Sequence, residues 1–181
     1  MKSAGWNLIK ADSTPSIAEH SYRNALIALI LAKLEKCKNP EKIALAALMH
    51  KMHKIRLCDR HKVSAQYMDY PRKVKVEINK DQLSLLGDDL KREFEDILDL
   101  SDDEKVVVKD ADQLELALEA KEYMDKGYDK AKIWIERIEQ ILITNSAKEL
   151  FNKIKKTHSC DWWANLKKKP QTDKKEYISR I

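Results

Sequence analysis

Residues 16–34 carry the sequence SIAEHSYRNALIALILAKL, in which apolar side chains recur at helical spacing. Ser16 and Glu19 match a capping box, in which each side chain accepts a hydrogen bond from the backbone N–H of the other residue. Pro15 suits the first turn of a helix. The stretch therefore predicts a long, partly apolar helix that begins at Ser16 or just before it.

Glycine and proline are scarce: the 181 residues include 3 glycines and 4 prolines. Sheet proteins of this size need many glycine and proline turns, so the scarcity indicates long helices with few connections. Hydrophobic residues make up 43% of the chain and charged residues 36%, which allows a full core beneath a charged surface. The length fits one domain, and no repeat or low-complexity linker divides it. A single all-α domain is predicted.

Helical patterning continues along the rest of the chain. Ser101 and Glu104 form a second capping box at the start of a long helix, and Gly127 is expected to cap its end. Residues 71–78 are ambiguous, because apolar and charged side chains alternate there as in a strand; a loop that enters a helix is favoured. The further predicted helices cover residues 40–52, 62–70, 81–98 with a break at Gly87, 101–124, 129–143 and 146–156.

The sequence argues against a membrane span and against a nucleic-acid reader. The longest purely apolar run, Ala25–Ala32, is far shorter than the roughly 20 residues that a span requires. No apolar segment follows Met1 and Lys2, so no secretory signal is expected. Lys and Arg number 35 against 30 Asp and Glu, and both signs are mixed along the chain instead of gathering on one basic face. Neither a membrane nor a nucleic acid is an expected partner.

Cys37, Cys58 and Cys160 are odd in number, widely spaced and without a CxxC pair. They are interpreted as free thiols, which predicts a reducing, cytoplasmic location. The lysines of residues 166–181 are interpreted as a solvated basic tail.

Side chains of the kind that bind metals interrupt three apolar helical segments. A single histidine in such a helix is usually a hydrogen-bonded core residue, but three groups on three helices are harder to explain in that way. Buried carboxylates also need a partner that offsets their desolvation, and a histidine-lined metal cavity supplies one. The three groups are Glu19 with His20, His50 with His53, and Asp110 with Asp112.

Four segments occur in an order that resembles the HD-domain 5'-deoxynucleotidase family, small helical phosphohydrolases that release phosphate from deoxynucleoside monophosphates. The segments are SIAEHSYR at 16–23, ALMHKMH at 47–53, Cys58-Asp59, and KDADQLE at 109–115. The likeness extends from Gly5-Trp6 to Trp162-Trp163. It implies an all-α HD-type helical bundle over residues 1–165, a homodimer, and a deoxynucleoside monophosphate or a similar small phosphate as the ligand.

The resemblance also implies a divalent metal (Mn, Co, Mg or Zn). The positions of its ligands in the family are His20, His50, Lys51 and Asp112 in this chain. A family glutamate and aspartate that activate water and handle protons fall at Lys54 and Asp59. Lysine thus replaces a carboxylate at two positions, and Cys58 replaces the glycine of a Gly-Asp turn, where a positive φ would be strained.

These lysines oppose metal binding, because an ammonium group has three donors and no acceptor. The family's four carboxylates sum to −4, whereas Asp59, Asp112 and the two lysines sum to zero. We therefore expect Lys51 to take the place of the metal and to pair with Asp112. Lys54 would pair with Asp59 or Glu19. This hypothesis describes a family member with lost or weakened hydrolysis and a retained nucleotide-type pocket.

Other interpretations stay open at this point. A metal held by His20, His50 and Asp112 alone could support hydrolysis with Asp59 assisting proton transfer, since three protein ligands plus water suffice for a zinc-type site. His53 or His61 could join that set. The chain could also be a purely structural, dimeric helical module.

Three weaker features have two readings each. Trp6 could stack on a nucleotide base or anchor the N-terminal segment. Arg23 could bind phosphate or pair with an acidic neighbour. Trp162 and Trp163 are expected to form a docking patch for the C-terminus or a second subunit.

Overall fold

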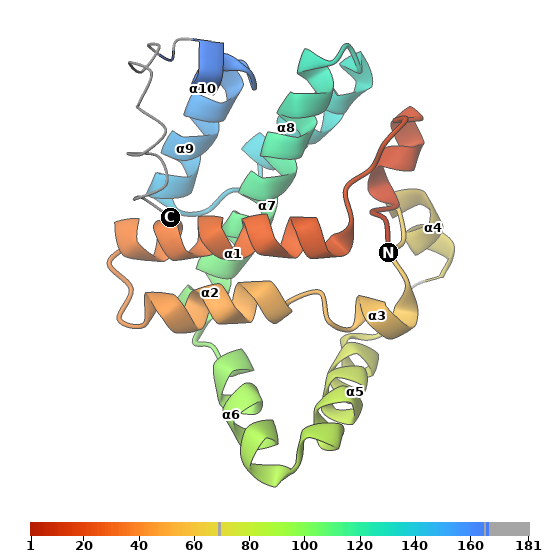
Figure 1. Cartoon of the computed structure of the whole chain (residues 1–181), viewed down its shortest axis with the longest axis vertical. Coiled ribbons are helices and arrows are strands. Elements are labelled where there is room, and N and C mark those ends of the chain that lie inside the picture. Colours follow the sequence, from red (N-terminus) through yellow and green to blue (C-terminus); the bar gives the residue numbers. More distant parts are fainter. Residues whose placement is uncertain (69, 165, 167–181) are drawn as a thin grey trace, which may run out of the picture.

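The computed structural model describes residues 1–68, 70–164 and 166. Within these residues it contains helices and one isolated antiparallel bridge, between Lys2 and Ser16, and no sheet (Figure 1). The predicted all-α class is confirmed. No helix in this described part is both long and apolar enough to cross a membrane. The predicted tail, 166–181, lies outside the described residues except for Leu166, so its boundary stays a prediction.

The helices follow one another with short connections. They are α1 (Ile17–Leu34), α2 (Pro40–Met49), α3 (Lys54–Leu57), α4 (Lys62–Tyr67), α5 (Arg72–Leu83), α6 (Asp88–Leu98), α7 (Asp102–Asp125), α8 (Lys132–Glu139), α9 (Asn145–Lys156) and α10 (Asp161–Ala164). Short 3-10 turns cover Gly5–Ile9, Ser84–Leu86 and Asp129–Ala131.

Both predicted capping boxes are confirmed. Ser16 Oγ accepts a hydrogen bond from the Glu19 N–H at 3.1 Å, and the Glu19 carboxylate accepts one from the Ser16 N–H at 2.5 Å. Ser101 and Glu104 make the same pair of bonds at the start of α7. Gly127 lies just beyond the end of α7 with φ +94°, as expected of a cap.

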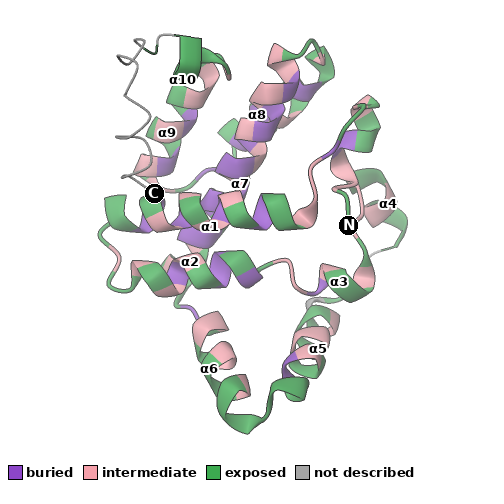
Figure 2. Ribbon diagram, viewed as in Figure 1, coloured by how far each residue is buried: buried purple, intermediate pink, exposed green. Residues whose placement is uncertain are grey.

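The core lies where α1 and α2 pack side by side against the long α7. Figure 1 shows α8 and α9 on one side of this layer, while α5 and α6 extend from the other side as the two arms of a V. Figure 2 shows buried residues concentrated on α1, α2 and α7, whereas α5 and α6 are mostly exposed or half-buried. The V therefore leaves one side of the α2–α7 layer open.

Three predicted boundaries differ from the structure. Residues 72–83 form α5 instead of a loop, because Val74 and Ile78 lie four residues apart on its half-buried face, while Val76 is exposed. Helix α2 ends at Met49 rather than at Met52, and α8 ends at Glu139 rather than at 143. At both ends the next N–H groups bond to carbonyls three residues back, as in a tighter 3-10 turn that stops the α-helix.

Candidate functional site

Three segments distant in sequence bring their polar side chains together around Asp112. His20 projects from α1, Lys51 from the turn after α2, and Asp112 from α7. His20 Nε2 lies 2.9 Å from Asp112 Oδ1, and Lys51 Nζ lies 3.0 Å from each Asp112 oxygen. His50, at the end of α2, lines the same cavity as Lys51 and Asp112. The structure thus contains the Lys51–Asp112 pair that the charge count predicts.

Lys54 and Asp59 form a second ion pair beside the first. Asp59 also accepts a hydrogen bond from the Ala4 N–H at 2.7 Å, which ties the N-terminal segment to this turn. Burial and the nearby Lys51 ammonium lower the pKa of Lys54, and the contact with Asp59 only partly opposes this. Of the two partners predicted for Lys54, the structure has Asp59, while Glu19 caps α1.

Helix α7 carries a row of carboxylates toward α1. Glu115 is fully buried and accepts hydrogen bonds from Arg23 Nη2 at 2.6 Å, from Arg23 Nε at 2.9 Å and from His20 Nδ1. The row consists of Asp112, Glu115, Glu119 and Glu122. Glu115 and Glu119 were not among the site residues predicted from the sequence. Their spacing of three and four residues along the apolar face of a predicted helix was the available signal.

The contacts in this row set the protonation of its members. Burial alone would lower the pKa of His20, but the hydrogen bonds to Asp112 and Glu115 raise it to about 9. Burial would raise the pKa of Asp112, but the Lys51 ammonium and the His20 hydrogen bond hold it well below its usual range. Burial and the neighbouring Glu115 raise the pKa of Glu119 to about 8. At neutral pH, His20 is therefore a cation and Asp112 an anion.

Trp6 and Arg23 have the structural role that was one of the two interpretations given for each. Trp6 is only 1% exposed, packs its ring against Tyr123 and Trp134, and donates its indole N–H to Glu119 at 2.6 Å. Arg23 is held by Glu115 and, at 2.8 Å, by Glu122. Both side chains serve the packing of α1 and α7, so a ligand role for either stays an untested prediction.

The other candidate ligands have different surroundings. Asp110 is buried and accepts hydrogen bonds from the Ile143 and Thr144 backbone and from Thr144 Oγ1, so it fastens α7 to the start of α9, away from His20. His61 Nδ1 accepts from the Ser64 N–H and caps α4. His53 is buried against the cavity wall, where burial and Lys75 lower its pKa to about 4.

A cavity of about 880 Å³ opens beside the two ion pairs, between the α2–α7 layer and the V of α5 and α6. Its volume lies within the range of small-molecule sites, roughly 300–1,000 Å³. Charged and apolar side chains share the lining. The apolar members include Met49, Val76, Leu83, Leu98 and Val108.

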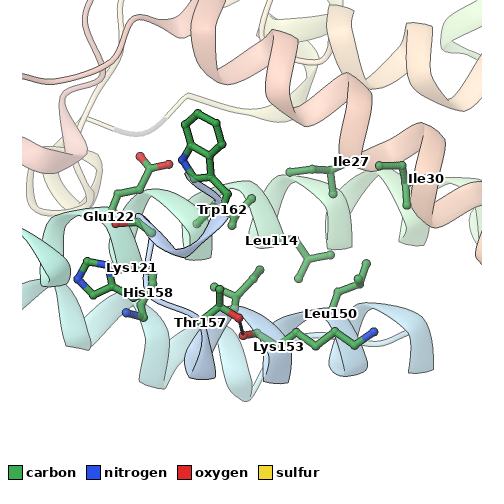
Figure 3. A pocket seen from close by; sticks show the side chains of 13 residues that line it. Ile27, Ile30, Leu114, Lys121, Glu122, Leu150, Lys153, Thr157, His158 and Trp162 are labelled. Atoms are coloured by element: carbon green, nitrogen blue, oxygen red, sulfur yellow. Dashed lines mark hydrogen bonds between the residues drawn. The ribbon is translucent and has the colours of Figure 1, made fainter. Parts of the chain in front are cut away.

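A second cavity, of about 410 Å³, contains none of the motif residues. Figure 3 shows Ile27 and Ile30 of α1 on one side of it and Leu150 and Lys153 of α9 on the other, with Trp162 at its edge. Six of its 13 lining residues are aliphatic, and the polar ones include Lys121, Lys153 and His158. The docking role expected of Trp162 and Trp163 stays a prediction.

The residues around Asp112 do not fit a divalent metal. Lys51 brings an ammonium where the family has a carboxylate ligand, and both ring nitrogens of His20 are engaged by carboxylates. Among the described residues, donor atoms of His20, Glu115 and Glu119 lie within 4.8 Å of one another, a spacing that could hold an ion. Arg23 Nη2, however, already lies 2.6 Å from Glu115 and 3.6 Å from Glu119 and supplies a cation there.

Cys58 has φ +60° and ψ +168°, a backbone region that essentially only glycine occupies without strain. The turn therefore has the backbone conformation typical of glycine, although residue 58 is a cysteine. Such strain costs about 1–3 kcal/mol. Replacing Cys58 with glycine would relieve the strain, but glycine loses more conformational freedom on folding, which offsets part of the gain.

We expect Cys58→Gly to stabilise the protein by about 1 kcal/mol and to raise the melting temperature by about 2–4 °C. Cys58→Ala is the matched control, because it removes the same exposed thiol and keeps the strain. Thermal unfolding followed by circular dichroism measures both. Equal melting temperatures for the two variants would show that the turn is not strained.

The chain is similar to known proteins over most of its length. A family model described as HD domain matches residues 2–155. A 5'-deoxynucleotidase of Photobacterium profundum is 28% identical over 157 residues, covering 80% of this chain and 81% of the relative. One of Citrobacter koseri is 27% identical over 158 residues, covering 80% and 79%. A genomics crystal structure superimposes with a TM-score of 0.72, 31% identity and 87% coverage of each chain. A conserved hypothetical protein of Pyrococcus furiosus has a TM-score of 0.65, 26% identity, and coverage of 84% and 90%.

Proposed function

The chain belongs to the HD domain family, with 5'-deoxynucleotidase-like relatives, and from this premise we propose that it binds a small nucleotide-type phosphate without metal-dependent hydrolysis. The observation that carries the proposal is the contact of Lys51 Nζ with both oxygens of Asp112. A lysine ammonium there replaces the charge that a metal would bring and occupies the carboxylate that would hold it.

The electrostatic cost of adding a metal supports this function. At 4 Å and an effective dielectric constant of 20, two unit charges interact by about 4 kcal/mol, so a divalent ion beside Lys51 meets repulsion of roughly twice that size. The protonated His20 adds to it. Among the described residues, Asp112 is the carboxylate that contacts both Lys51 and His20, so these two cations already neutralise it.

The same residues retain the means to bind phosphate. Lys51 and Lys54 are the cations of the motif that line the cavity, and an ammonium donates to phosphate oxygens as a point charge. Asp59, the remaining acidic position of the motif, is engaged by Lys54 and the Ala4 N–H. The lining therefore favours an anionic ligand, but it has no unpaired carboxylate at the motif to accept a proton from an attacking water.

One observation favours a second function, an active phosphohydrolase. His20, His50 and Asp112 are all present at the positions that the resemblance assigns to metal ligands, and the curated relatives are named 5'-deoxynucleotidase. In that case Lys51 would swing away from Asp112 when an ion binds.

Phosphate release from deoxynucleoside 5'-monophosphates tests the proposal, with Mn²⁺, Co²⁺ or Mg²⁺ in parallel with EDTA. We expect no metal-dependent release from folded protein, and a rise in melting temperature with the nucleotides that is equal in Mn²⁺ and in EDTA. Metal-dependent release would establish the three-ligand alternative. If no nucleotide shifts the melting temperature, the interpretation that remains is a purely structural helical module. The homodimer and the cytoplasmic location expected from the sequence stay predictions.

A further inference from the structure

The cavity beside Lys51 and Asp112 has more positive charge than its two ion pairs need. With its histidines neutral, the lining has six lysines against three carboxylates. Asp59 and Asp102, which are not part of the lining, neutralise Lys54 and Lys105, so one positive charge remains in excess. The lysines are Lys51, Lys54, Lys75, Lys80, Lys105 and Lys109, and the carboxylates are Glu95, Asp99 and Asp112. Positive charge gathered in a concave site favours an anionic ligand.

Lysines extend along both walls away from the ion pairs. On α7, Lys105, Lys109 and Asp112 follow at intervals of four and three residues, so they lie on one face of the helix. At 1.5 Å per residue this row is about 10 Å long. Across the cavity, α5 contributes Lys75 and Lys80. A ligand whose negative charge lies at one end only would contact only some of these lysines.

Three of these lysines are available to a ligand. Lys51 and Lys54 are paired with Asp112 and Asp59, and Lys105 is 2.9 Å from Asp102. Lys75, Lys80 and Lys109 are exposed, and within the described part of the chain none has a carboxylate within 4 Å. They are therefore the lysines of the lining whose ammonium groups are not held by a carboxylate.

Resting on the proposed function, we propose that this cavity prefers a nucleoside diphosphate over the monophosphate of the curated relatives and binds it without metal. A nucleoside diphosphate carries about three negative charges at neutral pH on two linked phosphates, so it can contact lysines on both walls, whereas a monophosphate carries about two on a single phosphate. The diphosphate extends from Lys51 and Lys54 toward Lys109 and Lys75. The base lies on the apolar part of the wall, near Met49 and Leu98.

Calorimetric titration in EDTA tests the preference with three probes: a deoxynucleoside diphosphate, its monophosphate and inorganic pyrophosphate. We expect the diphosphate to bind about tenfold more tightly than the monophosphate, with pyrophosphate the weakest of the three. Lys75→Gln/Lys109→Gln should weaken diphosphate binding about tenfold and remove the preference. Lys148→Gln/Lys156→Gln on α9 loses the same charge outside the cavity and should keep it. Melting curves confirm that both variants are folded.

Each contrary result has a distinct meaning. Equal affinity for the monophosphate and the diphosphate would overturn the inference while leaving metal-free nucleotide binding intact. Retention of the preference in Lys75→Gln/Lys109→Gln would also overturn it. Pyrophosphate that binds as tightly as the nucleoside diphosphate would overturn the nucleoside assignment. No binding of any probe in EDTA would overturn both the inference and the proposed function.

Discussion

A Lys51→Asp/Lys54→Glu variant is expected to bind Mn²⁺ and to release phosphate from deoxynucleoside monophosphates about 100-fold faster than the parent chain. The two changes bring the motif from zero net charge to four carboxylates, which again calls for a cation. Asp112 then loses its ammonium partner, and the new carboxylate at position 51 adds the oxygen ligand that His20, His50 and Asp112 lack. A bound divalent ion would supply the activation of water that hydrolysis requires.

Mn²⁺ titration and phosphate release, measured separately, test this variant. Lys148→Asp/Lys156→Glu is the control, because it makes the same change in charge on α9, outside the cavity. The control should bind no Mn²⁺ and release no phosphate. If the motif variant fails to bind Mn²⁺ although it is folded, the two lysines are not what prevents metal binding. If the parent chain is already as active as the variant, the ion pairs do not block hydrolysis.

Local chemistry explains which parts of the fold were predictable. Ser16 and Ser101 begin their helices through side chains three residues away, so neighbouring residues alone contain the signal. The end of α2 depends on how the chain turns to place Lys51 beside Asp112, 61 residues later. No local pattern carries that information. The alternation of apolar and charged side chains in residues 71–78 did not indicate the helix clearly, because it is typical of a strand, although apolar residues at i and i+4 also lie on one face of a helix.

The side-chain contacts of the site also divide into those that could be predicted from the sequence and those that could not. The pair Lys51–Asp112 was predicted from charge balance at the positions that the resemblance assigns, whereas for Lys54 the prediction left two partners open, Asp59 and Glu19. The partners of Arg23 could not be predicted, because Glu115 lies 92 residues away and looks like any other helical glutamate. The burial of Trp6 could not be predicted from the sequence either. Its burial depends on Tyr123 and Trp134, which only the packing of α7 and α8 brings to it.

Glu115→Ala is expected to reduce the free energy of unfolding by about 4 kcal/mol, because it removes one partner of a buried ion pair and leaves the other. Glu115 is fully buried and accepts three hydrogen bonds, from both Arg23 and His20. Without it, the guanidinium and the imidazolium face each other with too few carboxylates. His20 is then expected to lose its proton more readily, since the Glu115 hydrogen bond is one of the contacts that raise its pKa.

Glu122→Ala is the matched control, because Glu122 also binds Arg23 at 2.8 Å but its side chain is 42% exposed. Water replaces an exposed partner, so its loss should cost about 1 kcal/mol or less. Urea unfolding followed by circular dichroism compares the two variants in EDTA. Equal losses would mean that burial does not strengthen this row of ion pairs. A loss confined to Glu115→Ala would mean that α1 is held to α7 by charges that remain balanced when no metal is bound.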